Sequence, residues 1–392
     1  MAPDPAVSPS GYIPGLEGVV ATQTAIGKVE DGNLVYRGYS IDELAGRAEY
    51  EEVAYLLLNG DLPDREQLRD FREELVKNRQ LSPTLRGMLE EQSEHGTPMD
   101  VLRTVASASS LEDDDEGDNS AEAEMRKSIR LVAKFPTILA SYIRRRQGRQ
   151  PIPPDASLGH AANFARMVWG DKVPHAKAAE TLNTCFILQA EHGLNASTFT
   201  ARVVASTEAD MHAAVTAALG ALKGPLHGGA TDTTMKMLEE VGSPERADAY
   251  VVRALTSHPI QKIYGFGHRV YKTDDPRAKH LQKFARELGK DASGPRYFEM
   301  QEAVRAAVEK HRVEAKQSVR DKIGVVNVDY YAATTYTYLG LPADLGTSIF
   351  AVGRIAGWCA HIMEQHAHNR IIRPESEYTG PTGKRWVPLA ER

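Results

Sequence analysis

The sequence predicts an all-α fold with a minor β element near the N-terminus. Apolar residues recur at helical spacing through most of the 392-residue chain, for example at Leu68, Phe71 and Leu75. Helix-start signals are frequent, whereas strand-type alternation is confined to the N-terminal part. The chain contains no fixed-period repeat, heptad pattern or low-complexity array. Its length suits one large or two moderate domains.

The N-terminal part should contain short strands or an extended arm at residues 15–20 and 34–39, where valines alternate and glycines recur. Ser40 and Glu43 have the spacing of a capping box, which predicts the start of a helix. We expect that helical run to end near Gly60.

Helices dominate the rest of the chain. Ser82 and Thr97 are each followed by proline, the order of an N-cap and a first helical residue. Pro136 should kink or break a long helix, and the acidic residues 112–118 predict a solvated, mobile loop or a helix start. The other expected helices span residues 68–77, 123–146, 158–169, 178–191, 198–205, 210–222, 235–240, 247–256, 278–288, 299–316 and 345–365.

Composition excludes several classes of protein. The residues are 42% hydrophobic and 26% charged, and a formal net charge of -6 argues against a general nucleic-acid binder. The two cysteines, Cys185 and Cys359, lie in apolar helical contexts, so we expect buried thiols in a reducing compartment. No apolar run reaches membrane-spanning length and the first residues show no signal pattern, so we expect a cytoplasmic protein.

Three histidines lie beside glycines where helices are interrupted. His227 follows a Gly-Pro pair and precedes two glycines, His268 follows Gly267, and a third junction holds His192. Glycine lets the backbone take positive φ and approach a ligand closely. A lone histidine of this kind is more often an ordinary loop residue, but its recurrence favours a functional site.

Cationic residues near these loops point to an anionic ligand. Asp275, Pro276 and Arg277 have the order of an N-cap, a first-turn proline and a cation, so we expect a helix start there. Arg277 would then lie near the positive end of a helix, which attracts anions. Arg354 lies within an apolar, small-residue helix, where an unpaired charge would be costly.

Seven short sequence motifs are more specific than these general patterns. They are LVYRGY (34–39), EHGLNAS (191–197), GPLHGGA (224–230), GFGHRVYK through DPR (265–277), NVD (327–329), GRIAGW (353–358) and IRP (372–374). In content and order they resemble the citrate synthase family, including its 2-methylcitrate synthase branch. One departure is Val326, where the family usually has a proline that would stiffen the loop before Asp329.

The resemblance implies a two-domain helical fold and a homodimer. A large domain would comprise residues 1–223 and 325–392, the latter with a C-terminal arm, and a small domain would comprise residues 224–324. The implied reaction belongs to the tricarboxylic acid cycle. It joins acetyl-CoA to oxaloacetate through an enolate, and water then hydrolyses citryl-CoA to citrate and CoA. Acetyl-CoA is a co-substrate, and the resemblance implies no metal or redox cofactor, no nucleic acid and no membrane.

The resemblance also implies catalytic roles. Asp329 matches the base that removes a proton from the thioester methyl group, and desolvation beside Tyr330 and Tyr331 would raise its pKa. His227 matches the donor to the thioester oxygen, and His268 matches the residue that polarises the ketone and protonates the alkoxide. From the residues alone, Asp329 could instead be a helix N-cap.

Substrate contacts follow from the same resemblance. Two carboxylates need cationic partners, and arginine offers each a planar fork of donors. The implied oxaloacetate contacts are His192, Arg277, Arg354 and, from the other subunit, Arg373. The implied CoA contacts are Tyr264, Gly265, Phe266, Gly267 and Lys272.

Three other interpretations remain open. The protein could be a 2-methylcitrate synthase that uses propionyl-CoA, since one methylene is worth only about 1–3 kcal/mol of discrimination. It could be a non-catalytic helical scaffold, although a scaffold has no reason to keep His227, His268 and Asp329 together. It could be a metal-dependent hydrolase, but the histidines lack a metal-ligand spacing such as His-x-x-x-His.

Overall fold

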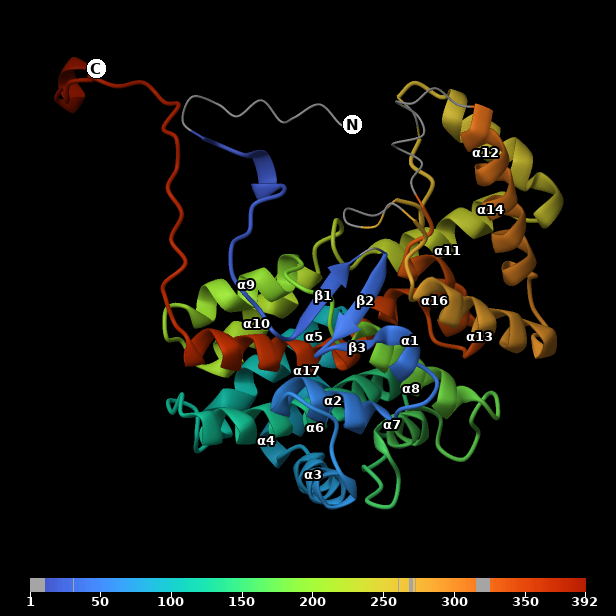
Figure 1. Ribbon diagram of the computed structural model, residues 1–392, viewed down its shortest axis with the longest axis horizontal. Coiled ribbons are helices and arrows are strands. Elements are labelled where there is room, and N and C mark those ends of the chain that lie inside the picture. Colours follow the sequence, from blue (N-terminus) through green and yellow to red (C-terminus); the bar gives the residue numbers. More distant parts are fainter. Residues whose placement is uncertain (1–10, 31, 260, 268–270, 272, 315–324) are drawn as a thin grey trace.

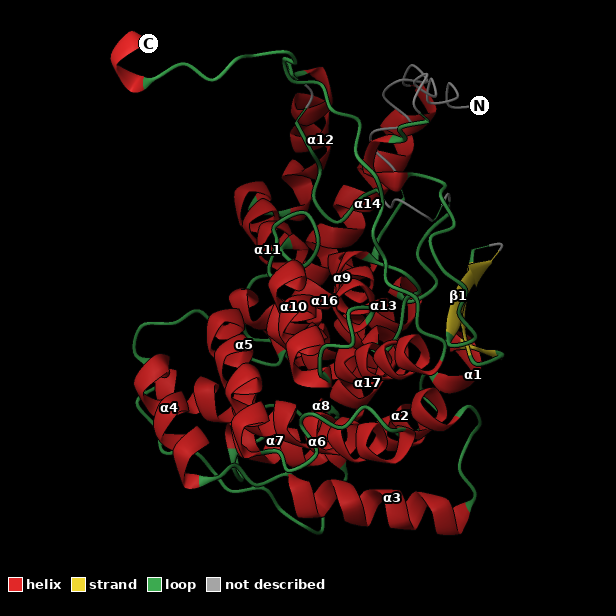
Figure 2. Cartoon of the chain, turned by 90° about the vertical axis from the view of Figure 1, so that its left-hand side faces the viewer, coloured by secondary structure: helices red, strands yellow, loops and turns green. Residues whose placement is uncertain are grey.

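The protein is built almost entirely of helices, with a small sheet at one edge (Figure 2). This arrangement confirms the predicted all-α class with a minor N-terminal β element. No helix in the described ranges is both long and apolar enough to cross a membrane. The computed structural model describes residues 11–30, 32–259, 261–267, 271, 273–314 and 325–392.

The sheet has three antiparallel strands in the order β1-β2-β3. Alternate side chains of the middle strand point inward, and Leu34 and Tyr36 are fully buried. β2 therefore anchors the sheet to the helical core. The strands are β1 (Gly27–Glu30), β2 (Asn33–Tyr36) and β3 (Tyr39–Ser40).

Of the two forms expected for residues 15–20, a short strand or an extended arm, the strand does not form. Pro14–Leu16 make a 3-10 turn, and residues 17–20 are exposed and outside any strand. The expectation of a single helix from Ser40 to near Gly60 is wrong. Ser40 does cap a helix, but α1 (Ile41–Leu44) is only four residues long. The chain turns through Gly46, at φ 80°, before the next helix begins, so the expected single helix is two helices.

The next nine helices follow the predicted series closely. Ser82 and Thr97 cap two of them as expected, and the long helix α6 continues through Pro136 rather than ending there. They are α2 (Tyr50–Asn59), α3 (Arg65–Asn78), α4 (Pro83–Ser93), α5 (Pro98–Ala108), α6 (Ala121–Arg146), α7 (His160–Trp169), α8 (Ala178–Gln189), α9 (Ala196–Ala205) and α10 (Met211–Leu222).

The remaining helices complete the fold, and α11, α12 and α14 lie at the opposite end from α3 and α4 (Figures 1 and 2). They are α11 (Ala230–Val241), α12 (Ala247–Thr256), α13 (Ala278–Asp291), α14 (Tyr297–Glu314), α16 (Val328–Tyr338) and α17 (Gly346–Ala367). The short 3-10 turns are η1 (Pro14–Leu16), η2 (Ser109–Glu112), η3 (Pro244–Arg246), η4 (Ala343–Leu345) and η5 (Leu389–Glu391).

The central helix α17 packs against α6, α8, α9 and α10, and α16 packs against α11 and α13. Most of the side chains of α17 are therefore buried. The helix start expected at Asp275 lies later, because Asp275 Oδ1 accepts the backbone N–H of Arg277 in a turn and α13 begins only at Ala278.

The acidic segment at 112–118 is largely exposed, as expected, but it is attached to α6 at two points. The side chain of Asp113 is fully buried, and Arg130 binds it through Nε at 2.9 Å and Nη2 at 2.6 Å. Arg126 binds Asp115 in the same bidentate way. These two arginines of α6 hold the segment on the helix.

Candidate active site

His227 is held in a tight loop between α10 and α11. A Cβ at Gly228 would lie 2.3 Å from the carbonyl oxygen of Leu222, so only glycine fits there. The hydroxyl of Thr347, at the start of α17, donates to the Gly228 carbonyl at 2.5 Å. The loop is thereby fixed to the central helix.

Hydrogen bonds determine the tautomer of His227. The backbone N–H of Ser197, in the first turn of α9, donates to Nε2 at 3.3 Å, and Ser197 Oγ lies 2.9 Å from the same atom. A backbone N–H can only donate, so Nε2 accepts and the proton resides on Nδ1. Burial, assisted by the positive charge of Arg354, lowers the pKa of His227 to about 4. The imidazole is therefore neutral at pH 7.

Asp329 lies in the first turn of α16. The side chain of Asn327 caps this helix by accepting the N–H of Asp329 at 3.1 Å. The preceding backbone pairs with a glycine loop: Gly267 N–H donates to Val325 O at 2.7 Å, and Asn327 N–H donates to Gly265 O at 3.0 Å. Two segments far apart in the sequence are thus joined beside Asp329.

Burial sets the basicity of Asp329. It raises the pKa of this carboxyl to about 6, and the positive charges of Arg277 and Arg354 oppose the rise. The group is still mostly ionised at pH 7, but it is a stronger base than an ordinary aspartate. A carboxyl with this pKa suits proton abstraction near neutral pH.

The loop expected to bind CoA lies next to α16. Gly265 has φ 82°, and a Cβ there would lie 2.3 Å from Cδ2 of Tyr330. Phe266 is buried and its ring centroid lies 4.9 Å from that of Tyr330. Tyr264 is half-buried, with the Lys262 ammonium 5.5 Å from its ring centroid. Glycine therefore allows the close contact between this loop and α16.

Two buried guanidinium groups lie at the site. Arg277 binds Asp275 through Nε at 2.9 Å and Nη2 at 2.7 Å. Arg354 donates from Nε to the carbonyl of Gln189 at 2.5 Å, and its guanidinium lies 4.6 Å from the ring centroid of Phe350. In both arginines, Nη1 is buried and has no hydrogen-bond partner among the described residues. A carboxylate ligand would satisfy both groups.

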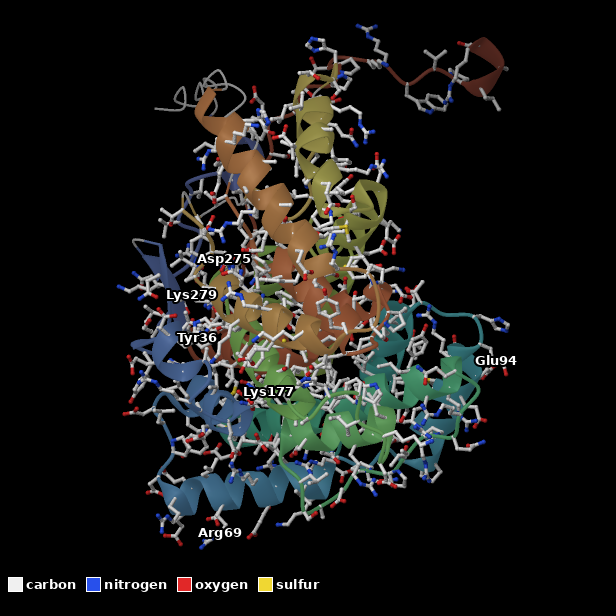
Figure 3. The ribbon with its side chains drawn as sticks, turned by 90° about the vertical axis from the view of Figure 1, so that its right-hand side faces the viewer. Tyr36, Arg69, Glu94, Lys177, Asp275 and Lys279 are labelled. Atoms are coloured by element: carbon white, nitrogen blue, oxygen red, sulfur yellow. The ribbon has the colours of Figure 1, made fainter. Side chains whose placement is uncertain are left out.

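His192 lies at the turn after α8. Its Nε2 is 3.0 Å from the hydroxyl of Tyr271. The turn is held by Tyr36 of β2, whose buried hydroxyl donates to the carbonyl of Glu191 at 2.9 Å and accepts its N–H at 3.3 Å. Figure 3 shows Tyr36 and Asp275 along the same edge of the molecule.

The structure brings five of the predicted residues together. Arg354 influences the pKa of both His227 and Asp329, and Arg277 influences the pKa of Asp329. His192 joins them because the tyrosine hydroxyl that it contacts lies in the field of Arg277. A carboxyl with a raised pKa, a neutral imidazole and two buried arginines thus lie within electrostatic reach of one another.

Three other predicted residues are not placed there. His268 and Lys272 lie outside the described residues. Arg373 is exposed on the C-terminal arm, which runs out from the end of α17 (Figure 1). The arm is held at Ile372, whose N–H donates to Ser206 Oγ at 2.9 Å. A single chain therefore does not bring Arg373 to the other five.

Sequence reasoning missed the residues that hold the site in place. Ser197 positions His227, Asp275 holds Arg277, and Tyr271 contacts His192. Trp358 also belongs to this set, because its Nε1 donates to Ser197 Oγ at 3.2 Å. All four lie within or beside the seven motifs named above, but spacing in the sequence does not reveal which side chain each one contacts.

Metal-ligand and thiol chemistry have little support in the described part of the chain. No three His, Cys, Asp or Glu side chains there could hold a metal ion together. Cys185 and Cys359 are buried and free. Burial raises the pKa of each thiol to about 12. Neither cysteine is therefore a reactive nucleophile.

Comparison with known proteins agrees with this arrangement. Residues 15–375 match the family model described as citrate synthase, C-terminal domain. Citrate synthase 2 of Bacillus subtilis is 42% identical over 96% of this chain and 98% of its own length. The 2-methylcitrate synthase 2 of Corynebacterium glutamicum is 38% identical over 96% of this chain and 97% of its own.

A solved structure is similar over nearly the whole chain. It is the ternary complex of citrate synthase from Thermoplasma acidophilum with carboxymethyl coenzyme A and oxaloacetate. Its TM-score is 0.87 at 29% identity, and the match covers 96% of this chain and 98% of that one. Fold and sequence agree, and the chain belongs to the citrate synthase family.

Proposed function

We propose that the protein is a citrate synthase, which condenses acetyl-CoA with oxaloacetate and releases citrate and CoA. One observation carries this proposal: Asp329, with its raised pKa, and the neutral His227 both lie within the electrostatic reach of Arg354, and Arg354 and Arg277 have unsatisfied donors. A non-catalytic scaffold would have no use for this combination.

The first step is removal of a proton from the methyl group of acetyl-CoA. Asp329 takes the proton, and the electron pair moves toward the thioester oxygen. His227, which carries its proton on Nδ1, donates a hydrogen bond to that oxygen as the enolate forms. A neutral imidazole suits this role because its N–H can donate a hydrogen bond while the ring stays uncharged.

Oxaloacetate occupies the arginine site. Its carboxylates pair with Arg277 and Arg354 at the Nη1 atoms, which have no partner among the described residues. His192 contributes a further hydrogen bond. Arg373 reaches the same ligand from the partner subunit.

Carbon–carbon bond formation needs the ketone to be polarised. The enolate carbon attacks the ketone carbon, and His268 protonates the alkoxide that results. Water then cleaves the thioester of citryl-CoA, so that citrate and CoA leave. The chemistry is acid–base throughout, and the CoA lies along residues 264–267 with Lys272 near a phosphate.

The exposed apolar side chains of the C-terminal arm support a homodimer. Ile371 is 59% exposed, Tyr378 70%, Trp386 79% and Leu389 81%. Such a row of apolar groups is normally covered by a partner. In the dimer, the arm would carry Arg373 into the neighbouring site. The buried free thiols suit the reducing environment of the cytoplasm.

Domain closure would assemble the site around both substrates. A smaller domain built on residues 224–324 would close on the remainder of the chain. Ion pairs between these parts, Lys177 with Glu287 at 2.7 Å and Lys279 with Asp42 at 2.5 Å, are partly exposed and therefore weak enough to be remade (Figure 3). Small-angle scattering tests this directly, since oxaloacetate should make the protein more compact.

The choice of acyl-CoA is tested by measuring CoA release with oxaloacetate. We expect acetyl-CoA to be strongly preferred over propionyl-CoA. A preference for propionyl-CoA would instead assign the protein to the 2-methylcitrate branch, to which the Corynebacterium relative belongs by name. The roles of Asp329 and His227 would be the same in either case.

A further inference from the structure

A buried carboxylate that the proposed mechanism does not use lies beside the arginine site. Glu191 precedes His192, and its side chain is completely buried. Two glycines make room for it. A Cβ at Gly357 of α17 would lie 2.8 Å from Glu191 Oε2, and a Cβ at Gly27 of β1 would lie 2.8 Å from Glu191 Cγ.

Two polar groups lie close to one oxygen of the Glu191 carboxylate. Gly193 N–H donates to Oε1, and His361 Nε2 lies 3.1 Å from the same oxygen. Arg202 Nη1 lies 3.1 Å from Nδ1 of His361 and can only donate, so Nδ1 accepts and the imidazole proton is on Nε2, facing Glu191. The Gly193 N–H donates a hydrogen bond, whereas the contact with His361 Nε2 is close but lacks hydrogen-bond geometry. Oε2 has no hydrogen-bond partner among the described residues.

Glu191 acts on Arg354 through its charge. Gly357, which touches Oε2, lies one turn of α17 after Arg354, and the Nε of Arg354 is bonded to Gln189, two residues before Glu191. No hydrogen bond between the two side chains is present among the described contacts, yet Glu191 is the strongest influence holding up the pKa of Arg354 against burial, which lowers it to about 10.

We infer that Glu191 is a positioning residue that serves as the internal counter-charge of Arg354 and weakens the hold of the site on dicarboxylates. This inference rests on the proposed function. Without a ligand, the negative charge of Glu191 offsets part of the desolvation cost of the buried Arg354 guanidinium. When oxaloacetate binds, its carboxylate pairs with Arg354 in the presence of the like charge of Glu191, which opposes tight binding and favours release of the more highly charged product.

The test removes the charge and keeps the shape. Glu191→Gln retains an oxygen for Gly193 N–H, so we expect the Kd for oxaloacetate by calorimetry, and the KM for oxaloacetate, to fall about tenfold. Inhibition by citrate should strengthen in parallel, while the KM for acetyl-CoA changes little. If Glu191 had a merely structural role, its substitution would raise the Kd and the KM for oxaloacetate.

Glu51→Gln is the matched control. Glu51 is also a buried glutamate, but it accepts the backbone N–H of His160 at 2.7 Å and is influenced by Arg72 rather than by the arginines of the site. Its substitution should leave oxaloacetate binding unchanged. If Glu191→Gln binds oxaloacetate as weakly as the parent or more weakly, while the parent enzyme turns over, the inference fails but the proposed function stands.

Two further results separate the remaining possibilities. Glu191→Asp keeps the charge and should bind oxaloacetate within about twofold of the parent. If Glu191→Gln does not fold, a tenfold loss of affinity in Glu191→Asp would show that reach rather than charge matters, and the inference would fail. A folded parent that neither binds oxaloacetate nor releases CoA would overturn the proposed function and this inference with it.

Discussion

The backbone N–H of Ser197 and the Nε2 atom of His227 lie 3.3 Å apart, and this contact defines the chemistry of the imidazole. The donor belongs to the first turn of α9, where the partial positive charge of the helix also disfavours an imidazolium. His227 is therefore held neutral, with its proton on the ring nitrogen that does not contact Ser197.

Replacement of His227 should impair the chemical step. We expect His227→Ala to lower kcat by about 10²–10³-fold, because one donor to the developing enolate is lost. The KM for oxaloacetate should change little. Steady-state CoA release measures both constants. His95→Ala, at a strongly exposed histidine, is the control and should behave as the parent does.

The raised pKa of Asp329 predicts an acid limb in the pH profile. The base must be ionised, so kcat/KM for acetyl-CoA should fall about tenfold per pH unit below pH 6. His227, with a pKa of about 4, does not titrate in this range. A profile that stays flat down to pH 5 would exclude Asp329 as a base with this pKa.

The same shift predicts a stability effect. The pKa of Asp329 rises from 3.8 to about 6 on folding, so between these values the folded state binds more protons and its stability falls as pH rises. Asp329→Asn should therefore raise the free energy of unfolding at pH 8 by up to about 3 kcal/mol. Denaturant unfolding at pH 8 and pH 5 checks this, since the gain should shrink at the lower pH.

Gly265 and Gly267 allow a matched comparison of two alanine variants. Both have positive φ, at 82° and 90°, but among the described residues a Cβ at Gly265 would meet the side chain of Tyr330, whereas one at Gly267 would meet none. Gly267→Ala should cost about 1 kcal/mol of stability, and Gly265→Ala about 2 kcal/mol more because α16 must shift. Equal losses in thermal unfolding would show that the contact with α16 has no energetic role.

Much of the fold could be predicted from local signals. Caps such as Ser82 and Thr97 locate helix starts, and helical periodicity identifies the class. Of the strand and the extended arm expected at 15–20, the strand does not form, because proline and glycine at 14–15 favour a tight turn. The burial of Asp113 within the acidic segment could not be predicted, because its partner Arg130 comes from another element and such pairing is set only by tertiary packing.

The candidate site was predictable to a similar extent. His192, His227, Arg277, Arg354 and Asp329 came from motifs, and the structure brings them together. Their supporting residues were not predictable, because hydrogen-bond partners far apart in the chain leave no periodic signal. Glu191 illustrates this: in the sequence it looks like an ordinary surface glutamate, and only its burial in the structure distinguishes it.

The most direct test is CoA release by the parent and by Asp329→Ala, with acetyl-CoA and oxaloacetate. We predict steady turnover by the parent and a loss of about 10²–10⁴-fold in a variant whose circular dichroism is unchanged. Activity of the variant within tenfold of the parent would contradict Asp329 as the base. No CoA release from the folded parent would contradict the enzyme itself and favour a non-catalytic helical scaffold.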